Sequence, residues 1–382
     1  MTVNYVNGFD WIPSNSSQVT MKGYLAAERW YISRKPNNDT YVDLAWPTAT
    51  TTGRFGFGNA MFFGASIISS GGPYFLGIVH PITYSGSTII LNAACRRLSN
   101  SVVAGIPGGG AIGIYDGVYG ICRIAVTLSP NGIIRVWTGD PTNIGVTVSQ
   151  LITSVTGVFL EDVWFHLQIK ITFGLSNTGA LEIRVNNETV IDAPATNIAA
   201  GDCICLGVVQ GINLNSYYNG FVIDDLSVND SSGDIHDNFL GNLRVKTQAV
   251  IADGTHIDSS IGGTAPAATH WQSVNVVRTD DTKYVYTPTV SDYDLYDLAA
   301  NQTGPFARAV QVRLVARQDD ATQRTIKAAL KTSTTLSLGT LEFHLNQDYS
   351  HWTDVWQVSP DTGTDFTTAE LNVLEAGFEV HS

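Results

Sequence analysis

Aspartates gathered in three short runs are the side chains of this sequence with the clearest capacity for chemistry. Carboxylate oxygens are the ligands that Ca²⁺ prefers, so runs of this kind can contribute to a calcium site. The alternative is that they cap turns, because an aspartate before a strand commonly accepts hydrogen bonds from nearby backbone. We keep calcium as an expectation without assigning a ligand. The runs are Asp224 with Asp225, Asp280 with Asp281, and Asp292, Asp294 and Asp297 within D-Y-D-L-Y-D.

Cleavage of glycosidic bonds by two carboxyl groups is a second chemistry to consider. A nucleophile and a general acid must lie about 5 Å apart, which alternating acidic residues on one strand can achieve. The sequence has no E-x-D-x-E run. Its nearest candidates, Glu182 and Glu188, are separated by a predicted turn at Asn186 and Asn187, so their pairing does not follow from the sequence. We therefore predict no catalytic residues and expect that the chain is not an enzyme.

Cysteine, histidine and glycine residues form no metal or cofactor motif. Cys203 and Cys205 make a single C-x-C in an apolar segment, which favours buried, reduced thiols over zinc. His344 and His351 are the one pair of histidines close in sequence, and H-E-x-x-H does not occur. The run Gly108–Gly110 is followed by no Lys-Ser or Lys-Thr, so it predicts a loop and not a phosphate site. We expect no cofactor.

The composition of the 382 residues limits the partners of the chain. A net charge of −13 would repel a phosphate backbone over most of the surface, so nucleic acid is not an expected partner. The longest apolar stretch, Ser101–Tyr115, is broken by glycines and a proline, and we predict neither a membrane segment nor a signal peptide. Charged residues make up only 14%, which leaves surface to be covered by other subunits. We expect a homo-oligomer, with a trimer favoured by analogy to jelly-roll proteins of virus particles.

Alternating apolar residues predict strands through the first part of the chain. In Trp164–Phe173 every second side chain is apolar, which fits a strand and not a helix. The run from Cys122 to Leu128, a turn at Ser129–Gly132, and then Ile134 and Val136 predict a hairpin. Many short strands separated by glycine and serine clusters are typical of a jelly-roll sandwich. Tryptophans in the first sixty residues could stack on sugars, but we expect them to fill core or interfaces: Trp11, Trp30 and Trp46.

A domain boundary is predicted after the strand that begins at Phe221. Val222, Asp224, Leu226 and Val228 alternate and should share one face of that strand, and Asn229–Gly233 should be an exposed turn. We therefore predict a first domain over residues 1–232 and a second over 233–382.

The second domain is predicted to be smaller and rich in β-strands, with one short helix near its end. Strands are expected at Lys283–Thr287, Ala309–Arg317 and Arg324–Lys331. Thr367 and Glu370 match a capping box, and Gly377 could end the helix in the left-handed conformation. The fold class predicted for the whole chain is all-β.

Several segments in a fixed order resemble a family of tailed-bacteriophage virion proteins whose first domain is concanavalin A-like, also called laminin-G-like. The resemblance implies this fold for the first domain and a place in the virion, which is assembled in the host cytoplasm. The segments are G-F-D at Gly8–Asp10, G-R-F-G-F-G-N-A at Gly53–Ala60, I-D-D at Ile223–Asp225, F-L-G-N-L-R-V at Phe239–Val245, D-D-T-K-Y-V at Asp280–Val285, D-L-Y-D-L at Asp294–Leu298, A-V-Q-V at Ala309–Val312, and F-T-T-A-E-L-N-V-L-E-A-G-F at Phe366–Phe378.

Three functions remain open on this basis. The first is a structural protein on the capsid or tail surface, such as a decoration, fibre or accessory protein, with other virion proteins as partners. The second is a virion adhesin that binds host or mucus glycans through the lectin-like domain. The third is a capsule depolymerase.

Overall fold

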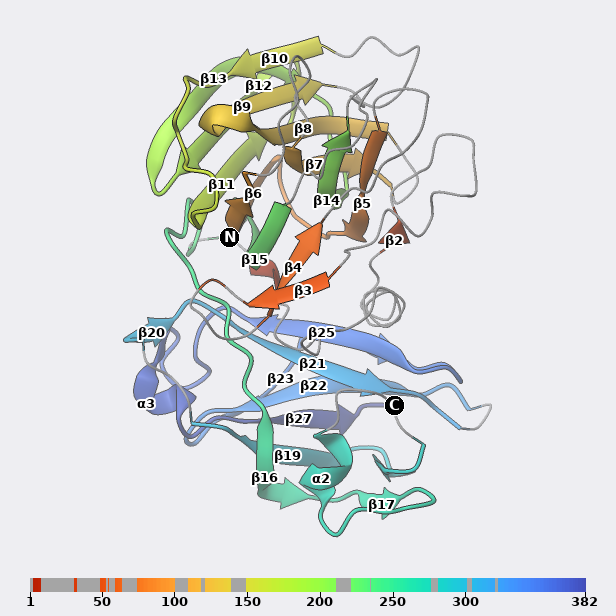
Figure 1. Ribbon diagram of the computed structural model, residues 1–382. Coiled ribbons are helices and arrows are strands. Elements are labelled where there is room, and N and C mark those ends of the chain that lie inside the picture. Colours follow the sequence, from red (N-terminus) through yellow and green to blue (C-terminus); the bar gives the residue numbers. More distant parts are fainter. Residues whose placement is uncertain are drawn as a thin grey trace. The chain divides into compact units, whose positions relative to one another are not determined.

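A computed structural model of the chain describes residues 3–7, 31–32, 49–52, 54, 59–63, 74–99, 109–117, 121–138, 149–210, 221–233, 235–275, 281–300, 304–319 and 322–382. Its contacts divide the chain into two compact units, Met1–Lys246 and Thr247–Ser382 (Figure 1). In the described ranges no helix is long and apolar enough to cross a membrane. The predictions for Trp11, Trp30, Trp46, Asp280 and Gly108 fall outside the described residues. The loop predicted at Gly108–Gly110 is wrong for Gly109 and Gly110, which begin the strand β7 (Gly109–Asp116).

Unit 1 is a sandwich of two antiparallel sheets, as its alternating sequence predicts. The sheet that we call the front sheet contains, in spatial order, β13 (Glu188–Ile198), β12 (Gly174–Val185), β11 (Phe165–Thr172), β6 (Thr88–Arg97), β15 (Phe221–Asp230), β4 (Asn59–Phe63) and β3 (Ala49–Thr52), with β1 (Val3–Asn7) also paired to β15. The back sheet contains β10 (Ser149–Thr153), β9 (Ile133–Thr138), β8 (Ile121–Ser129), β7 (Gly109–Asp116), β14 (Cys203–Gln210), β5 (Tyr74–Pro81) and β2 (Tyr31–Ile32).

The core of unit 1 lies between these sheets and follows the period of two. On β11, Phe165, Leu167 and Ile169 point into the core and are each at most 2% exposed. Val126 on β8 and Val136 on β9 belong to the same core cluster from the back sheet. The predicted all-β class and the jelly-roll sandwich are therefore confirmed.

Both tight hairpins of unit 1 have the backbone geometry that their sequences require. Between β8 and β9, Asn131 has φ 61° and Gly132 has φ 65°, and a Cβ at Gly132 would collide with the carbonyl oxygen of Phe159. Between β12 and β13, Asn186 and Asn187 have φ 51° and 73°, as a two-residue turn with positive φ at both positions demands.

β15 corrects the predicted alternation. Asp224 pairs with Ala94 and Ser227 with Asn92, so one extra residue bulges from β15, and Asp225 has φ 51°. Because of this bulge, Leu226 joins the core while Asp224 does not, and the prediction that both share a face is wrong. The core residues of this strand are Phe221, Ile223, Leu226 and Val228. The predicted exposed turn also starts too early, since Asn229 and Asp230 are buried in the strand.

The segment after β15 belongs to unit 1, whereas the sequence analysis assigned it to the second domain. The Val245 amide donates to Asp225 Oδ1 at 2.7 Å, and Asn229 Nδ2 donates to the carbonyl oxygens of His236 and Asn238 at 3.1 and 3.4 Å. These side-chain bonds hold a segment without regular secondary structure, which hydrophobic periodicity could not reveal. We call residues 235–246 the strap.

Unit 2 is a smaller β-rich fold. Its described main sheet contains β16 (Val250–Ile257), β19 (Tyr293–Leu298), β27 (Glu375–Val380), β22 (Thr325–Lys331) and β23 (Leu336–Leu338), with β24 (Phe343–His344) on β22. Three two-stranded ribbons accompany it: β17 (Ser260–Gly262) with β18 (Tyr284–Tyr286), β20 (Phe306–Ala307) with β26 (Phe366–Thr367), and β21 (Val310–Ala316) with β25 (Ser350–Trp356). The predicted strands over 283–287, 309–317 and 324–331 correspond to β18, β21 and β22.

The helices of unit 2 confirm one prediction and correct two. The capping box begins α3 (Thr368–Leu371), where Thr367 Oγ1 accepts from the Glu370 amide and Glu370 accepts from the Thr367 amide. A second short helix, α2 (His270–Val274), was not predicted. Gly377 does not end a helix but lies in β27, where a Cβ would collide with the carbonyl oxygen of Asp294. Glycine is needed there for close strand approach and not for a turn.

Candidate functional site

A row of buried polar side chains lies on the side of the front sheet that faces away from the core, and we call it the polar face. Gln168 Nε2 donates to Asn92 Oδ1 at 2.9 Å, and Asn92 Nδ2 donates to Asn229 Oδ1 at 3.0 Å. All three side chains are 0% exposed. They come from β11, β6 and β15, whose alternation sends these positions away from the core. A chain of amides therefore crosses three neighbouring strands.

Several polar atoms beside this row have no hydrogen-bond partner among the described residues. They are both ring nitrogens of His166, Oε1 of Gln168 and Oγ of Ser227, and these residues are at most 1% exposed. Burial, helped by the positive charge of Arg54, lowers the pKa of His166 to about 4. At neutral pH the imidazole is therefore uncharged, with one N–H donor and one acceptor that no described residue satisfies.

Asp224 and Asp225 act as clamps at one end of the polar face. Asp224 Oδ2 accepts from the Arg54 amide at 3.0 Å, and Asp225 Oδ1 accepts from the strap amide of Val245 at 2.7 Å. The Arg54 guanidinium lies 3.9 Å from Asp225 Oδ2. Backbone N–H groups and an arginine thus already occupy the carboxylates that the sequence offered as calcium ligands.

The acidic pair considered for glycoside cleavage is not brought together. Glu188 pairs with Val185 at the turn, while Glu182 stands opposite Asp192 and accepts from Arg184 Nε at 2.8 Å. Asp192 was missed because the two-residue turn alone would place Ile191 opposite Glu182. A register shift between Ile183 and Arg184 moves the pairing by one residue.

A hollow of about 330 Å³ opens between the edge strands of the sandwich, β10 on one side and β12 with β13 on the other. Its floor is apolar and largely buried, formed by Ile152, Leu181 and Ala193. Its rim carries the more exposed side chains of Asn177 and Asn197. The backbone N–H of Asn177 donates to Asn197 Oδ1 at 2.6 Å. None of the described residues that line the hollow is charged.

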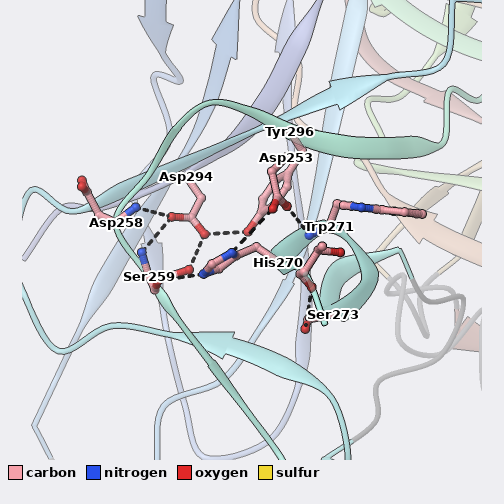
Figure 2. Close-up of polar contacts among 9 residues, drawn as sticks. Asp253, Asp258, Ser259, His270, Trp271, Ser273, Asp294 and Tyr296 are labelled. Atoms are coloured by element: carbon pink, nitrogen blue, oxygen red, sulfur yellow. Dashed lines mark hydrogen bonds and ion pairs between the residues drawn. The ribbon is translucent and has the colours of Figure 1, made fainter. Parts of the chain in front are cut away.

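Unit 2 contains a second polar cluster, centred on the fully buried Asp294 (Figure 2). Asp294 Oδ1 accepts from the amides of Asp258 and Ser259 at 2.9 and 3.0 Å. Asp294 Oδ2 accepts from the Ser259 hydroxyl and, at 2.6 Å, from the Tyr296 hydroxyl. Burial and the Asp294 charge raise the pKa of Tyr296, so its hydroxyl keeps its proton and donates. The carboxylate is thus fully occupied in holding the loop between β16 and β17.

The serine, histidine and aspartates of this cluster do not form a nucleophilic triad. His270 Nε2 lies 3.0 Å from the carbonyl oxygen of Ser259, not from its hydroxyl, and His270 Nδ1 lies 3.7 Å from Asp253 Oδ2 (Figure 2). Asp253 Oδ1 also accepts from the Trp271 amide at 2.6 Å. The Ser259 hydroxyl donates to Asp294 and not to His270, so the histidine is not placed to act as its base.

The other aspartates named in the sequence analysis are dispersed. Asp281 lies 3.0 Å from Arg317 Nη2 and accepts from the Tyr349 hydroxyl at 2.9 Å. Asp292 accepts from the Thr287 hydroxyl, and Asp297 is exposed on β19. Over the described ranges no three His, Cys, Asp or Glu side chains converge as metal ligands.

The cysteines and paired histidines are likewise explained by packing. Cys95, Cys122, Cys203 and Cys205 are free and buried, and burial raises the pKa of the Cys203 thiol to about 12. Cys203 and Cys205 share one face, as their spacing predicts. His344 Nδ1 lies 3.3 Å from Gln323, and His351 Nδ1 lies 2.6 Å from Arg313, so the two histidines have separate partners.

The two sheets of unit 1 define a jelly-roll sandwich. No protein-family model matches the chain, and no curated protein matches its sequence. Among solved structures, the PL-14 alginate lyase from Aplysia kurodai is 14% identical, with a TM-score of 0.41 over 60% of this chain and 99% of the lyase. The endo-β-1,4-glucuronan lyase from the fungus Trichoderma reesei is 14% identical, with a TM-score of 0.39 over 52% of this chain and 89% of the lyase. Sheep galectin-11 is 14% identical, with a TM-score of 0.25 over 40% of this chain and 99% of the galectin. At these identities the likeness shows the fold alone.

These similar structures correct the expectation that the chain is not an enzyme. That expectation rested on the missing E-x-D-x-E run, which is the signature of one kind of sandwich enzyme. Several of the matching structures are alginate or glucuronan lyases, at 9–14% identity and TM-scores of 0.31–0.41. The absence of the hydrolase signature therefore does not exclude an enzyme.

Proposed function

We propose that this chain is a surface protein of a tailed-bacteriophage particle and that its sandwich binds a neutral glycan. The virion assignment is supported by the ordered segments that resemble virion proteins. The observation that carries glycan binding is the uncharged hollow between β10 and the β12–β13 hairpin.

The hollow has the chemical character that a sugar ring requires. Its volume of about 330 Å³ lies at the lower end of ligand pockets, which suits one or two sugar rings. A pyranose offers C–H groups on its faces and hydroxyls around its rim. Leu181 and Ala193 can contact the C–H face. The side-chain amides of Asn177 and Asn197 can form hydrogen bonds with the sugar hydroxyls. With no charged residue in the lining, a neutral sugar is favoured over an acidic one.

The test is glycan-array binding by the purified full chain, followed by titration of the best neutral oligosaccharide. Asn197→Ala removes one rim amide and should weaken binding at least fivefold, since lost hydrogen bonds leave ligand hydroxyls unpaired. Asn187→Gly is the matched control: it removes an exposed amide at the Asn186–Asn187 turn, and its φ of 73° suits glycine. Unchanged affinity in Asn197→Ala, or no neutral glycan bound by the array, would contradict the proposal.

A depolymerase is the second candidate, because sandwich folds of this class carry lyase activity in other proteins. The same incubations should therefore be followed for shortening of the polysaccharide. Shorter products would identify an enzyme, and intact polysaccharide with measured binding would identify an adhesin.

Association with copies of itself and with other virion proteins is part of the proposal. Unit 2 exposes large apolar side chains, including Tyr286 at 53%, Leu341 at 51% and Val373 at 54%. Together with the low content of charged residues, they favour a homo-oligomer, for which we propose a trimer. Sedimentation at micromolar concentration should show a species near three times 41.2 kDa, and a stable monomer would count against association.

A further inference from the structure

The strap follows a path out across the polar face and back. It leaves β15 next to Asn229, and Asn238 accepts from Lys170 Nζ on β11 at 3.3 Å. The Phe239 ring lies under the Arg184 guanidinium of β12, 4.1 Å from it. The strap then returns, and its Val245 amide binds Asp225 on β15. His166 and Gln168, on β11, lie between the contacts that the strap makes with β12 and those that it makes with β15.

Several buried groups of the polar face lack the hydrogen bonds that buried polar atoms normally make. The ring nitrogens of His166, Gln168 Oε1 and Ser227 Oγ are buried and have no hydrogen-bond partner within the described part of the chain. A buried polar group without a partner carries its full cost of desolvation. If the strap opens, water or a ligand can bind these atoms and remove that cost. The unpaired groups therefore favour opening of the strap.

The strap lies outside the hydrogen-bond ladders of the sheets. It has no strand or helix, and side chains make the bonds that hold its backbone. The strap turns at Gly241, which has φ 80°. A Cβ built on Gly241 would meet no described atom within 4 Å. Asn242 Oδ1 accepts from Arg54 Nη1 at 2.5 Å on the return. Segments without regular secondary structure commonly open at lower free energy than the core strands of a sheet.

We propose that the strap is a displaceable cover and that the polar face beneath it is a second binding surface, for a neutral, hydroxyl-rich ligand such as a glycan chain. The unpaired groups are an uncharged imidazole, an amide oxygen and a hydroxyl, and hydroxyls of a ligand can both donate to and accept from them. The unpaired groups carry no charge, so burying an ionic ligand against them would cost its desolvation without a charged partner. None of these residues lines the hollow, so this surface stands whether or not the hollow binds a sugar.

Opening of the strap controls the affinity of this surface. When only a fraction of molecules is open, the apparent dissociation constant is the intrinsic constant divided by that fraction. A tenfold rise in the open fraction should therefore strengthen binding about tenfold.

Hydrogen exchange on the full chain tests the cover without a ligand. The Val245 amide should exchange at least 100-fold faster than the amides of β11, because the strap opens without unfolding the sheet. Phe239→Leu with Asn242→Ala should speed this exchange further, and His166→Met with Ser227→Ala should slow it about tenfold by removing unpaired groups. Asp237→Asn, at an exposed position of the strap, is the control and should change nothing. Exchange of Val245 only together with β11 would overturn the cover.

The binding surface is tested with neutral hexasaccharides, including maltohexaose and cellohexaose, at millimolar concentration. Each bound sugar should hold the strap open, so exchange at Val245 should rise at least fivefold in the wild type and in Asn197→Ala. The rise should be absent in His166→Met with Ser227→Ala. No response from any hexasaccharide, or a response that Asn197→Ala abolishes, would overturn the second surface, and the latter would assign the effect to the hollow.

Discussion

The Asp294 cluster of unit 2 and the polar face of unit 1 are both built from buried polar side chains on strands. They differ in whether the buried polar atoms have hydrogen-bond partners. Each oxygen of Asp294 accepts two hydrogen bonds from the groups around it. On the polar face, His166 and Ser227 keep unpaired atoms that are equally buried. A satisfied cluster holds a fold together, whereas an unsatisfied one stores free energy that opening or a ligand can release.

The largest effect is expected for Asp294→Ala, which should break the satisfied cluster. Loss of the carboxylate leaves the Tyr296 and Ser259 hydroxyls and two amides unpaired, so we expect unit 2 to lose about 3–5 kcal/mol of unfolding free energy. Urea unfolding of the full chain, with hydrogen exchange at β19 and β27 to assign the transition, measures the loss.

The matched control for this change is Asp297→Ala in the same D-Y-D-L-Y-D run. Asp297 is exposed on β19, and surface substitutions usually change stability by less than about 0.5 kcal/mol. Equal losses in the two variants would show that Asp294 has no special role.

His166→Met should have a smaller effect on the free energy of unfolding, and in the stabilising direction. Burial lowers the His166 pKa to about 4 in the folded state, so the unfolded chain binds more protons between about pH 6.5 and pH 4. The wild type should therefore lose stability as the pH falls through this window, by on the order of 3 kcal/mol from this residue alone. At neutral pH, His166→Met should be as stable as the wild type or more stable, because it removes unpaired polar atoms.

The measurement is the difference in unfolding free energy between wild type and His166→Met at pH 7.5 and pH 4. Using the difference cancels the titration of carboxylates that both proteins share. A difference that does not change with pH would mean that His166 is solvated or paired in the folded protein.

The smallest effect is expected for Phe239→Leu in the strap. Leucine keeps apolar bulk but removes the ring on which Arg184 lies, and a cation–π contact at a partly exposed site contributes about 0.5–1 kcal/mol. The free energy of unfolding of unit 1, measured by thermal unfolding, should fall by no more than this amount. A loss comparable to that of Asp294→Ala would show that the strap is a structural part of the sandwich and would weaken its role as a cover.

The sequence predicts the parts of this fold that depend on local pattern. The alternation in β11 and the turn residues Asn186 and Asn187 led to the observed strands and hairpin. The capping box at Thr367 and Glu370 likewise marked α3. In each case the residues that determine the structure lie within a few positions of one another.

The missing parts depend on contacts between distant residues. The bulge at Asp225 arises where β15 meets β6 and the strap, and no short pattern marks it. The register shift that brings Asp192 opposite Glu182 has the same origin. For Asp294, the spacing to Tyr296 could have indicated a shared face, but the amides of Asp258 and Ser259 that complete the cluster come from a loop 35 or more residues away.

The order of strands in space has a consequence for how the protein is made. β15, the last strand of unit 1, lies between β6 and β4, and β27, the last strand of unit 2, lies between β19 and β22. During synthesis, neither main sheet can close until its final strand has left the ribosome, so each unit waits with open strand edges for its last residues. A nascent chain stopped before residue 375 would hold β19 and β22 without the strand that joins them, and such a chain would be prone to aggregation.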